Sequence, residues 1–124
     1  MQKVTYPEEV EVLYMLPAIR RELAVYLKNK GLGHHEVAQL LRISEPSVSH
    51  YLNAKRATKV SFTEQEKEVI RKSAEKLLQN NSQLVQETAH LLHIFKESRA
   101  TCKVCTDVTD VPKGCVACFQ HNAL

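Results

Sequence analysis

The sequence predicts an all-α fold. Its 124 residues include only 3 glycines and 4 prolines, which is fewer turn residues than strand-rich domains usually need. Apolar side chains recur at helical spacing in several segments, and residues suited to helix capping precede some of them. Hydrophobic residues make up 44% and charged residues 25% of the chain, proportions typical of a globular protein.

Two helices are expected in the first part of the chain. Thr5 and Glu8 have the spacing of a capping box, and Pro7 falls where a missing amide donor costs little, which predicts a short first helix. Pro17 is expected to interrupt it. The next helix ends at Gly31, a natural C-terminal cap. Its apolar stripe, expected to face the core, comprises Ile19, Leu23, Tyr26 and Leu27.

Two short helices with almost no connection between them follow. The first is predicted over residues 34–41. Ser44 can cap the second, over residues 45–53, and Pro46 sits in its first turn, where it loses no intrahelical bond. Val48 and Leu52 are expected to point inward. The residues expected to point away from the core are Ser47, Ser49 and His50.

A helical pair is predicted next. Thr63 and Glu66 form a second capping box, which begins a charged amphipathic helix that runs to about Gln79. A polar break at residues 80–82 precedes another helix. Apolar residues also recur every seven positions at Ile70, Leu77, Leu84 and Leu91, so one long coiled-coil helix is the alternative. We favour the pair, with helix packing or dimerisation as its purpose.

Positive charge is concentrated in one part of the chain. Residues 17–59 carry eight lysines and arginines against three glutamates, a net +5, whereas the whole chain carries only +3. Local positive potential suits a polyanion such as nucleic acid, although a solvated basic face is the alternative. No stretch approaches the roughly 18 apolar residues of a membrane span, and no export signal is recognisable, so a cytoplasmic location is expected.

Residues 34–53 fit the helix-turn-helix pattern, in which one helix braces a second across the DNA major groove. Ala38 is small where the two helices must approach closely. Outward serine and histidine side chains can form hydrogen bonds with base edges and phosphates. One departure is Arg42 at the turn position that glycine commonly fills, which carries a steric cost in a left-handed conformation.

The segment "LPAIRRELAVYLKNKG", followed by "HHEVAQLLRISEPSVSHYLNAKR", is similar to the small Cro/repressor-like (XRE-type) helix-turn-helix transcriptional regulators of archaea and bacteria with a cysteine-containing C-terminus. The similarity covers about residues 10–60. It implies a homodimer on double-stranded DNA. The base contacts that it implies are Glu45, Pro46, Ser47 and His50. The implied phosphate contacts are Ser44, Ser49, Tyr51, Asn53, Lys55 and Arg56.

Four cysteines near the end of the chain form two CxxC pairs with nine residues between them: Cys102, Cys105, Cys115 and Cys118. Two residues between cysteines allow both thiolates to converge on one ion, and the intervening segment can turn back to close the site. Four thiolates suit tetrahedral Zn²⁺, which we prefer, and an iron–sulfur cluster is the close alternative. His121 could replace a cysteine, but exposure to solvent is favoured because four thiolates already complete the shell.

These features divide the chain into three predicted parts. They are a helix-turn-helix DNA-binding domain at residues 1–60, a helical dimerisation or packing region at 61–99 and a tetracysteine metal-binding tail at 100–124. The predicted function is sequence-specific transcriptional regulation without catalysis, the metal centre being structural or a redox or iron sensor. A metal-stapled protein-interaction adaptor is the alternative. A thiol oxidoreductase is less favoured, because a second CxxC pair is present and no strand–helix framework adjoins either pair.

Overall fold

The structure is a computed structural model that describes residues 6–53, 60–109, 115 and 118. Within these residues the regular structure is entirely helical, which confirms the all-α prediction. The helices are α1 (Pro7–Val10), the π-helical segment η1 (Glu11–Met15), α2 (Leu16–Asn29), α3 (His34–Leu41), α4 (Glu45–Leu52), α5 (Glu64–Gln79), the 3-10 turn η2 (Asn81–Gln83), α6 (Leu84–Glu97) and α7 (Ala100–Val108).

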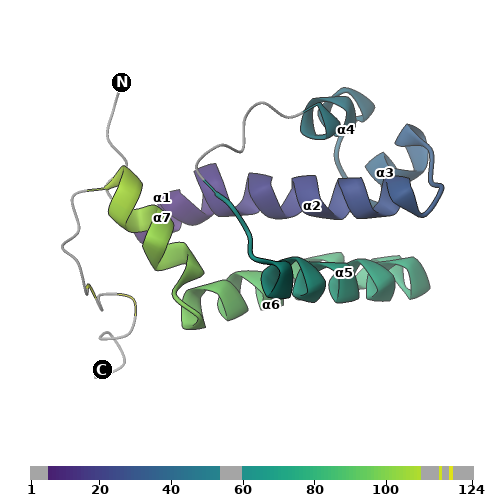
Figure 1. The fold of residues 1–124 in the computed structure, drawn as a ribbon. Helices are drawn as coiled ribbons and strands as arrows, with labels where there is room; N and C mark the ends of the chain where they lie inside the picture. The colour runs from purple at the N-terminus through teal and green to yellow at the C-terminus, as the bar shows by residue number, and fades with distance from the viewer. Residues whose placement is uncertain (1–5, 54–59, 110–114, 116–117, 119–124) are drawn as a thin grey trace.

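Helix α2 is the central element, and the other helices are arranged around it (Figure 1). It packs along α5, which in turn packs on α6. Helices α3 and α4 lie toward the C-terminal end of α2, whereas α7 packs on α6 and crosses near α1 at the other end (Figure 1). One cluster of buried apolar residues includes side chains from every α-helix, so the core continues across the predicted boundaries at residues 60 and 99.

The chain does not break at Pro17, so the predicted interruption is wrong. Helix α1, η1 and α2 follow one another directly, with Pro17 in the first turn of α2. The N–H of Leu16 donates to the carbonyl of Glu11, five residues earlier, which is the wider π turn. Because proline lacks an N–H and its ring crowds the carbonyl four residues before it, this wider turn lets the helix pass through Pro17.

The start of the first helix also differs from the prediction. The backbone N–H of Tyr6 donates to Glu9 Oε1 at 3.0 Å, so Glu9 and not Glu8 supplies the capping carboxylate. Thr5 lies outside the described residues. The C-terminal cap of α2 is as predicted, since Gly31 has a φ of +98°, a conformation that glycine adopts at little cost.

The helical pair is confirmed. Helix α5 begins with the predicted capping box, in which the Glu66 N–H donates to Thr63 Oγ1 at 3.1 Å and the Thr63 N–H donates to Glu66 Oε1 at 2.8 Å. The break is held by Asn80, whose Oδ1 accepts a hydrogen bond from the Ser82 N–H at 3.1 Å. Since α5 and α6 are separate helices that pack together, the single long coiled-coil helix is wrong.

Helix α7 is an element that the sequence analysis did not predict. It carries the first cysteine pair within the segment that we expected to be a metal-binding tail. Its buried residues are Ala100, Thr101, Val104 and Cys105. The tail therefore begins as part of the helical core. None of the helices in the described ranges is long and apolar enough to cross a membrane.

Candidate nucleic-acid interface and cysteine cluster

A tight turn joins α3 to α4. Arg42 ends α3 in the left-handed conformation, with φ 54° and ψ 45°. The Arg42 N–H donates to the Gln39 carbonyl at 3.3 Å, and the Ile43 N–H donates to the Ala38 carbonyl at 3.0 Å. These bonds satisfy carbonyls at the end of α3 that would otherwise lack partners. The turn therefore has the backbone geometry that glycine favours, with arginine in that position.

Helix α4 begins at the predicted cap. Ser44 Oγ accepts a hydrogen bond from the Ser47 N–H at 3.2 Å, and the two hydroxyl oxygens lie 2.8 Å apart. The next residue, Glu45, places its Oε2 3.2 Å from Nδ1 of His35, at the start of α3. His35 is therefore part of this surface, although the sequence analysis did not include it. The sequence contains one indication of this contact, because His35 and Glu45 each lie in the first turn of a predicted helix.

Helix α4 is docked on one side and open on the other. Val48 is completely buried and Leu52 is half-buried, as predicted. The opposite side is an exposed stripe at helical spacing, formed by Pro46, His50 and Asn53, which we call the outward stripe.

The other predicted DNA contacts lie around this stripe. Ser44 and Glu45 are exposed at the start of the helix, and three half-buried residues flank it: Ser47, Ser49 and Tyr51. The predicted phosphate contacts Lys55 and Arg56 lie outside the described residues. The structure thus brings most of the predicted contact residues to one short helix.

The cysteines lie at the opposite end of the molecule from α3. Cys102 and Cys105 are three residues apart in α7, a spacing that puts their side chains on neighbouring positions of the helix surface. Arg99 links this pair to the second: its Nη1 donates to the Cys115 carbonyl at 3.0 Å and lies 4.0 Å from Cys102 Sγ. One guanidinium therefore contacts both CxxC segments.

The pKa values of two thiols are raised by burial and by the other cysteines. Burial, followed by repulsion from the three other cysteines, raises the pKa of Cys105 to about 11, because both disfavour the negatively charged thiolate. Burial likewise raises the pKa of Cys118, where Cys102 and Cys115 act in the same direction and Lys96 opposes them. Cysteines of both CxxC pairs therefore contribute to the raised pKa values of Cys105 and Cys118.

Metal binding requires more than this proximity. Four thiolates at about 2.3 Å from one zinc ion must lie within about 4 Å of each other. Among the residues that the structure describes, no group of three or more histidine, cysteine or acidic side chains is arranged to hold a metal ion. His121 lies outside the described residues. The donor chemistry fits a soft metal, and the shared metal centre stays a prediction.

No protein family, no curated protein and no solved structure matches the chain.

Proposed function

We propose that the protein is a sequence-specific DNA-binding transcriptional regulator that places α4 in the major groove. The outward stripe of α4 carries this proposal: a helix docked by a fully buried Val48 leaves Pro46, His50 and Asn53 exposed. A short helix braced by a second one, with its polar face open, has the arrangement in which a recognition helix contacts base edges. The net positive charge of residues 17–59 supplies attraction to phosphates.

The contact residues divide into two groups by chemistry. Glu45, Pro46, Ser47 and His50 lie at the start and middle of α4, so we assign them to base edges. Since His35 contacts Oε2 of Glu45, Oε1 is the oxygen that accepts a hydrogen bond from a cytosine amino group. Phosphate contacts are assigned to the remaining predicted residues, Ser44, Ser49, Tyr51, Asn53, Lys55 and Arg56.

The test separates base contacts from phosphate contacts. A preferred duplex is first selected from a random pool, and binding is then measured by fluorescence anisotropy at several salt concentrations. The His50→Ala variant should lose its preference among duplexes. The Arg56→Ala variant should bind all duplexes more weakly, with a salt dependence reduced by about one phosphate contact.

A charge-matched control is available in α5. Lys72 is exposed there, outside the α3–α4 pair, so Lys72→Ala should leave both affinity and preference unchanged. Equal losses on every duplex for His50→Ala would contradict its role at base edges. If the unaltered protein binds no duplex at low salt, the DNA-binding proposal is wrong and the protein-interaction adaptor is favoured.

We also propose that the four cysteines hold one metal centre. Cys102, Cys105, Cys115 and Cys118 supply soft sulfur ligands, and the contacts of Arg99 with both pairs support their convergence. Bound zinc would staple the end of the chain to α7, whereas an iron–sulfur cluster would add redox chemistry. Elemental analysis and visible absorption of anaerobically purified protein distinguish the two, and the absence of stoichiometric zinc and iron would contradict the centre.

A homodimer is the assembly that we propose for DNA binding, because two half-sites raise both affinity and specificity. The exposure of Val12 (61%) and Leu13 (56%) on η1 supports a further contact surface. Light scattering of the protein with and without a selected duplex tests this. A single chain bound to each duplex at all concentrations would contradict it.

A further inference from the structure

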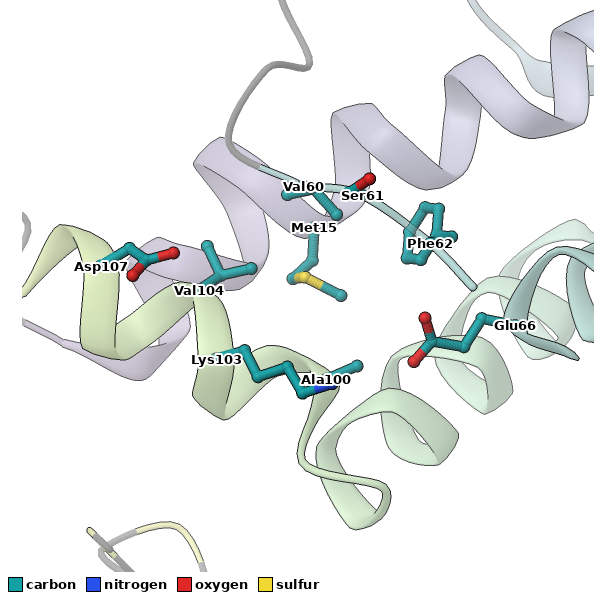
Figure 2. A pocket seen from close by; sticks show the side chains of 9 residues that line it. All are labelled: Met15, Val60, Ser61, Phe62, Glu66, Ala100, Lys103, Val104 and Asp107. Carbon is teal, nitrogen blue, oxygen red and sulfur yellow. The ribbon is translucent and has the colours of Figure 1, made fainter. Parts of the chain in front are cut away.

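A cavity of about 190 Å³ lies between the segment that leads into α5 and helix α7 (Figure 2). Met15, which is completely buried, forms part of its apolar lining together with Phe62 and Val104. The Phe62 ring stacks on Phe95 of α6 with ring centroids 5.1 Å apart, which fixes this wall of the cavity. The cavity is thus built from elements that are far apart in the sequence.

Helix α7 presents one regular face to this cavity. The residues that line it are spaced as one stripe of an α-helix: Ala100, Lys103, Val104 and Asp107. The cysteines of α7 are not among these lining residues. Helix α7 therefore contributes two cysteines on one face and part of the cavity lining on another.

Charged groups are placed around the apolar lining. Lys103 and Asp107 have no ion-pair partner among the described residues, and Glu66 extends toward the cavity from α5 (Figure 2). One carboxylate oxygen of Glu66 accepts the capping bond from the Thr63 N–H at 2.8 Å, which leaves the other oxygen available. The cavity therefore offers one cation and two carboxylates beside an apolar surface.

We propose that this cavity binds a small α-amino acid with an apolar side chain. Lys103 binds the ligand carboxylate, Glu66 binds its ammonium group, and the side chain packs against Met15 and Phe62. The size is suitable, because a cavity of about 150 Å³ holds a benzene molecule and the observed volume of about 190 Å³ is somewhat larger. A ligand with both charges can pair with both kinds of group at the rim, whereas an apolar compound can pair with neither.

The site has a direct connection to the rest of the molecule. Residues 60–62 line it and connect the α3–α4 half of the chain to α5, so a bound ligand contacts this connection. An effect of the ligand on DNA affinity rests on the proposed function. Binding of the ligand itself does not, and it is measured without DNA.

Isothermal titration calorimetry of the full chain tests the proposal. Leucine, isoleucine, valine, methionine and phenylalanine are titrated, together with 3-methylbutylamine and 4-methylpentanoate, which each lack one charged group of leucine. At least one amino acid should bind with one-to-one stoichiometry. Its binding should be at least tenfold tighter than that of either leucine analogue, because each analogue lacks one of the two charged contacts.

Matched variants locate the site. Glu66→Gln removes the charge but retains an oxygen for the capping bond, and Lys103→Gln removes the ammonium group at an exposed position. Each should weaken binding at least tenfold, whereas Lys72→Gln, outside the cavity, should not. Circular dichroism confirms that the variants fold. If no amino acid binds, if an analogue binds equally well or if the variants bind normally, the proposal is wrong, whatever the protein does with DNA.

Discussion

Helices α4 and α7 are nearly equal in length, with 8 and 9 residues, yet they are held in place by different means. Each follows an arginine with positive φ, Arg42 at 54° and Arg99 at 70°. Helix α4 is specified locally, because Ser44 caps it and the turn before it closes with its own hydrogen bonds. Helix α7 has no side-chain cap bond at its start, and burial against neighbouring helices holds it. Helix α4 keeps its outward stripe exposed, whereas α7 is fixed by packing and exposes a smaller part of its surface, which includes Lys103 and Asp107.

The largest expected effect comes from removing the buried valine of each helix. Val48 is completely buried under α4, and Val104 is 5% exposed under α7. Val48→Ala and Val104→Ala should each reduce the free energy of unfolding by about 2 kcal/mol, because each leaves a small cavity. Urea denaturation measures this. Val85→Ala, at an exposed position of α6, is the control and should change little.

These two variants also distinguish the helices by their consequences. If the proposed DNA binding is correct, loss of Val48 should weaken it more than loss of Val104, since of the two only Val48 lies under the outward stripe. Loss of Val104 should instead alter the cavity that it lines, and with it the proposed binding of an amino acid. If Val48→Ala were as stable as the unaltered protein, the docking of α4 on the core would be contradicted.

A smaller effect is expected at the cap of α4. Ser44→Ala removes the acceptor for the Ser47 N–H and should destabilise the protein by about 1 kcal/mol. Ser44→Asp keeps an acceptor at the same position and should retain most of the stability. Thermal unfolding followed by circular dichroism compares the three proteins. Equal stability of the alanine and aspartate variants would show that the side chain at position 44 does not cap the helix.

The sequence predicted those elements whose ends are marked by side chains. Ser44, the Thr63 capping box and Gly31 each act within a few residues of the chain, so their roles depend little on the rest of the fold. Helix α7 lacks such a mark: its N-cap residue is Arg99, and the spacing of its cysteines indicated a metal site instead of a helix. The passage through Pro17 was also missed, because it requires a π turn that sequence patterns do not reveal.

In the candidate sites, too, the sequence predicted features that are set locally and missed those that depend on contacts between distant segments. The outward stripe of α4 follows from helical spacing alone, and exposed His50 is where the sequence placed it. The contact between His35 and Glu45 spans the turn, so it depends on the angle between two helices. The cavity requires Met15, Phe62 and Lys103 to meet from three distant segments, and the sequence contains no local signal for that meeting.

The smallest expected differences concern Arg42 and Arg99, the two arginines with positive φ. At each site the backbone conformation and the side chain contribute separately to stability. Replacing arginine by glycine removes the steric cost of the left-handed conformation, whereas replacing it by alanine keeps that cost and removes only the side chain. At both sites the glycine variant should therefore be more stable than the alanine variant by about 1 kcal/mol in urea denaturation.

The alanine variants should differ from each other. Arg42 is exposed, and it contributes to its turn through backbone hydrogen bonds. Arg42→Ala should therefore change the free energy of unfolding little, and Arg42→Gly should stabilise the protein. Arg99 donates to the Cys115 carbonyl, so Arg99→Ala should release the second cysteine pair. Arg99→Gly should remove the steric cost of the left-handed backbone, but it should not restore the lost hydrogen bond to Cys115. Faster alkylation of Cys115 in Arg99→Ala, but not in Arg42→Ala, would identify the side chain as the link. Equal alkylation rates in both variants would show that the second pair is held by other contacts.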